Sequence, residues 1–167
     1  MAAQLGTSLY AFKNAFYTAL ATRVNNPTTG FTLSYAAPTD PVSVLGDSGS
    51  GVAAWWDDTT EGDVTVTVFK GGDKWFDESY TCTLIVQGLA LNTDEDQATI
   101  DLRTAQVLGE AIGLLAEDPT AGVVDTSTVE LFHAYPDGWT NRTGNLNLLT
   151  AGHFELRIRV EARLKLT

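Results

Sequence analysis

The clearest pattern in the chain is an alternation of apolar and charged side chains near its C-terminus. In the segment 152–166, even positions from Phe154 onward are apolar, and odd positions from Glu155 to Lys165 are charged. A period of two predicts a strand that buries one face and exposes the other. Because a shift of one residue would bury six charges, the pattern also fixes the register of this strand. A further strand is predicted upstream, at 128–135.

An amphipathic helix is predicted near the N-terminus, at 7–24. Apolar side chains recur there at spacings of three and four, which places them on one face. Thr7 or Ser8 is suited to cap the start of this helix, and Pro27 follows its predicted end. The apolar face consists of Leu5, Leu9, Phe12, Phe16 and Leu20.

A second helix is predicted at 94–116, with Asn92 or Thr93 as its cap. Acidic residues crowd its first turn, where the helix dipole favours negative charge. The segment Glu117-Asp118-Pro119 ends it, because proline disfavours helical geometry in the preceding residue. The predicted buried stripe consists of Ala98, Leu102, Ala105, Leu108, Ile112 and Leu115.

Several strands are predicted between the two helices, in the strand and loop region 31–91. Glycine and proline are frequent in 37–62, which predicts short strands joined by a long loop. The last two strands flank a turn at 70–73 and are expected to be an antiparallel hairpin or near neighbours in the sheet. The predicted strands are 31–35, 42–45, 52–56, 63–69 and 78–91. Closer to the C-terminus, the Asn-, Gly- and Thr-rich segment 136–151 is expected to be a long hairpin loop.

The order of these elements predicts an α+β fold. Strands come in runs rather than alternating with helices, which favours a mixed or antiparallel sheet of about 4–6 strands with both main helices packed on one face. The length of 167 residues fits a single domain, 1–167. At this size, folding removes roughly 70% of the unfolded chain's surface from water, enough for a sizeable core.

Composition and charge exclude several classes of protein. The chain is 44% hydrophobic, which argues against a disordered or collagen-like protein. Its net charge of −11 argues against a domain that reads DNA sequence, because phosphates would be repelled. No apolar run is long enough to span a membrane, and no secretory signal pattern is present at the N-terminus. The single cysteine, Cys82, cannot form an intrachain disulfide.

Positive charge is concentrated in the last predicted strand. Residues 1–150 carry 6 basic and 19 acidic side chains, whereas residues 151–167 carry 4 basic and 2 acidic ones. Two interpretations remain for Arg157, Arg159 and Arg163. They form cross-strand ion pairs on a solvated sheet face, or they contact an acidic surface, including another copy of the chain.

Two adjacent tryptophans, Trp55 and Trp56, end one of the short strands. Neighbouring side chains of a strand face opposite ways, so one indole is expected in the core. The other is expected either at the surface or buried in a partner, where tryptophan is enriched as an anchor.

Candidate catalytic and metal-binding residues are sparse. The segment Gly46-Asp47-Ser48-Gly49 resembles the nucleophile segment of trypsin-like proteases, and His133 or His153 would complete a triad. The chain is too short for the two barrels of such a protease, and no helix is predicted after Gly51. A flexible loop is therefore the favoured interpretation. Neither histidine has further ligands at zinc-site spacing, and no phosphate-binding glycine loop precedes a helix. No catalytic residue, metal site or cofactor is predicted.

Three features of the chain form a further pattern. The first is an N-terminal amphipathic helix followed by a variable strand and loop region. The second is the acidic turn and apolar strand Phe76-Asp77-Glu78-Ser79-Tyr80-Thr81-Cys82-Thr83-Leu84-Ile85-Val86, which leads into a helix with Arg103 near its start and Glu117-Asp118-Pro119-Thr120 at its end. The third is the alternating strand 152–164, ending in Glu161-Ala162-Arg163-Leu164. Together these features resemble the tail terminator (minor tail) proteins of long-tailed, siphovirus-type bacteriophages. The similarity covers about 74–166, and the segments 37–62 and 136–151 are longer here.

The resemblance implies a structural virion protein at the head-proximal end of the tail. Such a protein forms a ring, typically a hexamer, that stops polymerisation of the tail tube protein and docks to the head-to-tail connector or neck protein. It is assembled in the host cytoplasm, needs no cofactor, and lets DNA pass through its lumen without specific binding. The alternatives are another neck or tail-completion ring protein, a small serine hydrolase using Ser48, and a monomeric domain whose sheet and helices enclose an apolar ligand pocket.

Overall fold

The computed structural model describes residues 7–24, 31–33, 50–70, 73–91, 96–123, 129–146 and 149–166. These residues form two helices and six strands. The helices are α1 (Leu9–Val24) and α2 (Gln97–Glu117). The strands are β1 (Phe31–Leu33), β2 (Ser50–Trp56), β3 (Glu61–Lys70), β4 (Asp73–Leu91), β5 (Val129–Leu146) and β6 (Leu149–Leu166). The predicted strand 42–45 lies outside the described residues.

The six strands form one sheet around the two long central strands β4 and β6. The strand order is β1-β2-β4-β6-β5, and β3 pairs with β4 on the same edge as β2, but farther along. Ser50–Trp56 pairs with Leu84–Ala90, and Glu61–Lys70 pairs with Asp73–Thr81. Only the short β1–β2 pair is parallel among the described strands. The predicted hairpin of two antiparallel strands is therefore formed by β3 and β4.

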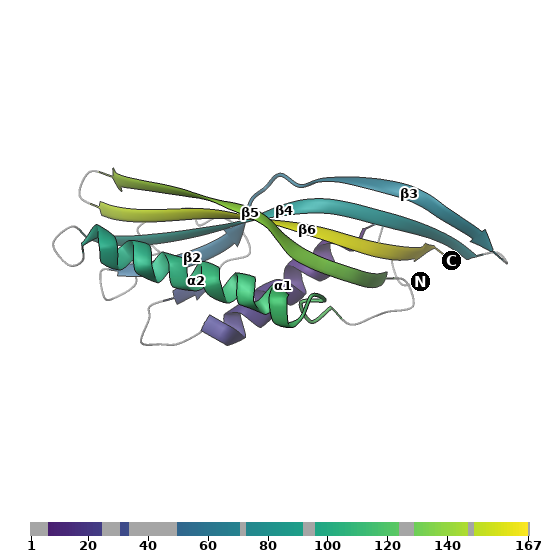
Figure 1. Cartoon of the computed structure of the whole chain (residues 1–167), viewed down its shortest axis with the longest axis horizontal. Coiled ribbons are helices and arrows are strands. Elements are labelled where there is room, and N and C mark those ends of the chain that lie inside the picture. Colours follow the sequence, from purple (N-terminus) through teal and green to yellow (C-terminus); the bar gives the residue numbers. More distant parts are fainter. Residues whose placement is uncertain are drawn as a thin grey trace.

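Both helices cover the same face of the sheet, and β3 and β4 extend beyond them at one end (Figure 1). We call this the helix face and the opposite one the outer face. Every second residue of β6 points into the core between sheet and helices, in the register that the alternation predicts. From α1, the buried side chains are Phe12, Phe16 and Leu20. The predicted α+β class, with a mixed sheet and two helices on one face, is confirmed.

Two facing glycines allow α2 to lie close to the centre of the sheet. Gly88 of β4 and Gly152 of β6 are register partners. A Cβ atom at Gly88 would come within 2.2 Å of the Thr104 hydroxyl, and one at Gly152 within 2.9 Å of an Asp101 carboxylate oxygen. The first turns of α2 therefore occupy the space that two side chains would fill.

The buried stripe of α2 differs from the predicted one. Leu108 and Leu115 are buried as expected, but Leu102 is 60% exposed. Ala98 and Ala105 are exposed as well. The observed stripe consists of Ile100, Thr104, Val107, Leu108, Ala111, Leu114 and Leu115. The helix carries two apolar stripes, and close approach to the glycine pair turns the one containing Ile100 and Thr104 toward the sheet.

Strand β5 is far longer than predicted, because most of the expected loop 136–151 is strand. Val129–Leu146 pairs with β6 over almost its whole length, from the pair of Val129 with Leu164 to the pair of Leu146 with Leu149. The pairing register shifts between Leu131 and His133 and again between Pro136 and Gly138. These bulges interrupt the alternation from which a strand is predicted. Pro136 is compatible with an edge strand, where one row of backbone amides has no strand partner.

The helices begin near the predicted caps. At the start of α1, the Thr7 hydroxyl accepts a hydrogen bond from the Leu9 amide at 3.1 Å. At the start of α2, the Asp96 carboxylate accepts one from the Thr99 amide at 2.8 Å. Hydrogen bonding from the Thr99 side chain, together with this amide, lowers the pKa of Asp96. The predicted caps Asn92 and Thr93 lie outside the described residues, and Asp96 is the N-cap.

Candidate interaction surfaces

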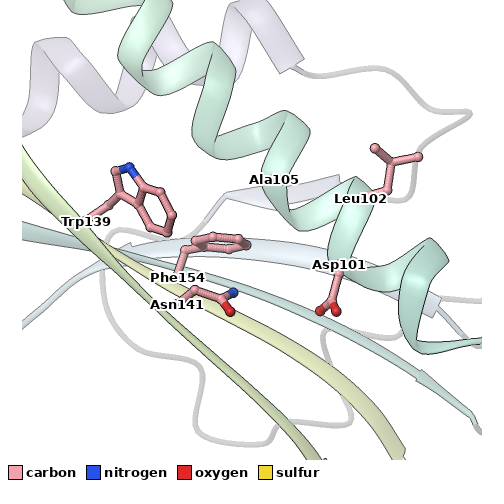
Figure 2. A pocket seen from close by; sticks show the side chains of 6 residues that line it. All are labelled: Asp101, Leu102, Ala105, Trp139, Asn141 and Phe154. Atoms are coloured by element: carbon pink, nitrogen blue, oxygen red, sulfur yellow. The ribbon is translucent and has the colours of Figure 1, made fainter.

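An open apolar groove lies on the helix face, between α2 and the β5–β6 pair. Its volume is about 380 Å³, and it is lined by Asp101, Leu102, Ala105, Trp139, Asn141 and Phe154 (Figure 2). Trp139 is 57% exposed and Leu102 is 60% exposed. Exposed large apolar side chains gathered in one place are typical of interaction sites. We call this surface the Trp139 groove.

Aromatic contacts and one carboxylate give the Trp139 groove its chemistry. The Trp139 and Phe154 ring centroids lie 5.7 Å apart with the planes tilted by 58°. In Figure 2 these two rings lie beside each other, and Asp101 points from α2 toward the strands. Asp101 Oδ1 accepts a hydrogen bond from Gln97 Nε2 at 2.9 Å, and the same nitrogen donates to the Ala151 carbonyl at 2.8 Å. The groove therefore offers an aromatic wall and one negative charge.

The outer face of β6 carries the arginines that the sequence singles out. Arg163 Nε donates to Asp77 Oδ1 at 3.0 Å, and Arg159 donates to the Ser79 hydroxyl at 2.9 Å. Arg157 is exposed and has no hydrogen bond or ion pair within the described part of the chain. Its guanidinium lies over the backbone of Gly138, where a Cβ atom would approach Nη2 to 2.9 Å. In-chain pairs thus engage two of the three arginines.

Acidic side chains lie beside this arginine row, toward the β3 edge. A cavity of about 230 Å³ is lined by residues of β3, β4 and β6, among them Asp63, Asp77 and Glu161. His133 of β5 approaches Glu161 to 3.7 Å and stacks on Tyr135, with ring centroids 5.2 Å apart. The outer face is therefore a mosaic of both charges rather than a purely basic stripe.

Both tryptophans of β2 are buried, on opposite faces of the sheet. Trp56 is 3% exposed and packs against Phe12 and Phe16 in the main core. Trp55 is 9% exposed and belongs to a smaller cluster on the outer face with Ala53, Leu89, Ala151 and Ile85. The expectation that one of them is exposed is wrong, because this second cluster covers the other indole. The exposed tryptophan is Trp139.

Sequence patterns missed Trp139 and Leu102 because each was assigned to a different environment. Trp139 fell within the expected loop 136–151, and Leu102 was counted in the buried stripe of α2. One signal was available: α2 has more apolar positions than a single stripe can hold, and Ala98, Leu102 and Ala105 make up the surplus. A second stripe on a surface helix indicates a second contact.

The candidate catalytic residues are not assembled into a site. Ser48 lies outside the described residues, and His133 and His153 stand on the outer face of β5 and β6, each beside a glutamate. Burial raises the pKa of the Cys82 thiol to about 12, which leaves it protonated and unreactive at neutral pH. Among the described residues, no group of His, Cys, Asp or Glu is arranged to hold a metal ion. No described helix has the length and hydrophobicity to cross a membrane.

Comparison with known proteins finds likenesses among solved structures. No protein-family model and no curated protein matches the chain. Among solved structures, a chain of the "virion of native gene transfer agent (GTA) particle" aligns with 95% of this chain and 99% of its own length. The sequence identity is 16% and the TM-score is 0.46.

Proposed function

We propose that this chain is a structural virion protein that caps the head-proximal end of a phage tail tube as an oligomeric ring. The observation that carries the proposal is the resemblance over 74–166 to tail terminator proteins. That range contains α2, β5, β6 and all but the first residue of β4, which are one covering helix, one edge strand and the two central strands of the sheet. The resemblance therefore concerns the body of the fold rather than a peripheral segment.

The surfaces of the chain suit an assembly protein. Trp139 and Leu102 are exposed together on the helix face, and the outer face carries a mosaic of acidic and basic side chains. Aromatic anchors with charged surroundings are the usual composition of protein interfaces. Association by such surfaces needs no bond to be made or broken, so we propose no catalytic residue and no cofactor.

The ring would limit tube length by having two different faces. One face matches the last ring of the tail tube protein, and the other docks to the connector or neck protein while rejecting a further tube subunit. Repeated contacts of one subunit edge with the opposite edge of the next close into a ring when the rotation permits. The net charge of −11 suits a lumen through which DNA passes without binding.

Adding the purified chain to a polymerising tail tube protein tests the proposal. We expect tubes of limited length with an extra ring at one end, seen by negative-stain imaging, and longer tubes without the chain. If the chain binds only the connector or neck protein, it is another neck ring protein instead of a tail terminator. Tubes of unchanged length without an added ring, together with no connector binding, would overturn the proposal.

A further inference from the structure

We propose that the Trp139 groove of one copy receives the outer face of the β5–β6 pair of the next copy, with Asp101 paired to Arg157. This inference rests on the proposed ring and names its subunit contact. It starts from Trp139 and Leu102, the large apolar residues of the groove that are exposed, at 57% and 60%. Leaving two large apolar side chains in water is unfavourable, and a partner surface would cover them.

Asp101 is the charged residue of the groove, and Arg157 is the arginine of β6 without an in-chain partner among the described residues. Asp101 Oδ1 accepts a hydrogen bond from Gln97, whereas Oδ2 accepts none from the residues that the structure describes. Arg159 and Arg163 are held by Ser79 and Asp77 of β4. Arg157 is therefore the arginine of this row that is free to pair with a carboxylate outside its own chain.

The two surfaces lie back to back on the same pair of strands. Trp139 is the register partner of Leu156, and the adjacent pair is Gly138 with Arg157. Successive residues of a strand face opposite ways, so Trp139 lies on the helix face and Arg157 on the outer face. A slab with complementary surfaces on its two sides is suited to head-to-tail association, in which each copy uses one side for each neighbour.

The outer face complements the groove in its aromatic side chains as well as in its charge. Tyr135, the register partner of Arg159, is 37% exposed and stacks on His133 at 5.2 Å, so it offers an apolar ring on the same outer face as Arg157. A guanidinium also stacks favourably on an indole face while it pairs with a carboxylate. In the proposed contact, Tyr135 covers the apolar wall, and Arg157 lies between Trp139 and Asp101 of the neighbouring copy.

A charge swap tests this contact. We expect Asp101→Arg and Arg157→Asp each to weaken self-association. The dissociation constant, measured by sedimentation at low salt, should rise by about tenfold or more. The double variant, which restores opposite charges, should recover most of that loss. Asp58→Arg and Lys13→Glu make the same changes of net charge at positions outside both surfaces and should assemble like the wild type.

Any other result of the charge swap overturns the proposed contact. Each such result can be told apart from failure of the ring itself. A ring that survives both single changes, or a double variant no better than either single one, overturns the pairing and leaves the ring standing. Equal losses in the two control variants attribute the effect to net charge alone. A chain that stays monomeric at the highest attainable concentration overturns the self-contact, while tube capping still tests the proposed function. Because Asp101 lies close to Gly152, Asp101→Asn provides a milder variant, and circular dichroism confirms folding.

Discussion

Glu78, in the middle of the sheet, binds the start of helix α1 through Ser8. The Ser8 amide and hydroxyl donate to Glu78 Oε2 at 2.8 and 2.7 Å, and the Thr7 hydroxyl donates to Oε1. The Tyr80 hydroxyl lies 3.1 Å from the same Ser8 hydroxyl. A carboxylate at a helix N-terminus satisfies free amides and interacts favourably with the helix dipole. This pair therefore fixes where α1 begins over β4.

Replacing Glu78 with alanine should lower the free energy of unfolding by about 2–4 kcal/mol, because buried donors at Ser8 lose a charged acceptor. Glu78→Gln should cost less, since the amide oxygen still accepts one of these bonds. Urea unfolding followed by circular dichroism measures both. The exposed Glu61 is the matched control, and Glu61→Ala should stay within about 0.5 kcal/mol of the wild type. A Glu78→Ala protein as stable as that control would show that the contact does not hold α1.

The glycine pair beneath α2 gives a second prediction. Gly88→Ala should destabilise the fold by about 1–3 kcal/mol, because its Cβ atom would meet the Thr104 hydroxyl at 2.2 Å and an Ile100 methyl at 3.1 Å. Thr104→Ala removes the closer contact, so the double variant should be less destabilised than the sum of the two single ones. Additive effects in this double-mutant cycle would contradict the close approach of helix and sheet.

Acid sensitivity should arise in part at the end of α2. Hydrogen bonds from the Thr120 hydroxyl (2.6 Å), the Thr120 amide (2.9 Å) and the Gly122 amide (3.0 Å) lower the pKa of Asp118. A carboxyl group whose pKa is lower in the folded state stabilises the protein above its unfolded pKa, and this contribution is lost as pH falls through the folded value. Asp118→Asn should therefore be less stable than the wild type at pH 7, and the difference should shrink below about pH 4. Thermal unfolding between pH 2 and pH 7 tests this, and a difference that is independent of pH would contradict it.

Substitutions of two tryptophans should have separate effects, one on assembly and the other on stability. Trp139→Ala should cost about 1 kcal/mol or less of stability, because the indole is 57% exposed, yet it should weaken self-association. Trp56→Ala should cost about 3–5 kcal/mol, because that indole is 3% exposed among Phe12 and Phe16. Chemical unfolding and sedimentation on the same samples distinguish the two. A Trp139→Ala protein that loses stability but assembles normally would assign Trp139 to the fold instead.

The sequence predicts the parts of this fold in which one pattern dominates. In β6, the strict alternation from Phe154 to Leu164 leaves one choice of buried face, and the structure has it. In β5, Pro136 and two bulges break that pattern, so the strand resembled a loop. In α2, two apolar stripes compete, and only the position of Gly88 and Gly152 on other strands selects the one containing Ile100.

The candidate site was less predictable than the fold. The arginines of β6 were placed on one face correctly, but their in-chain partners Asp77 and Ser79 come from β4, about 80 residues away in sequence. The pattern predicts exposure for one of Trp55 and Trp56 without saying which, but pairing of β2 with β4 places Trp55 beside Ile85 and Leu89. Contacts of this kind depend on register between distant strands, which local patterns do not encode.

Whether the chain forms a ring can be decided from its native mass, measured by light scattering over a range of concentrations and followed by negative-stain imaging. We expect a closed ring of several copies, typically six, with a central hole, formed by the chain alone or on addition of tail tube protein. A mass of one chain at every concentration, both alone and with tube protein, would contradict it.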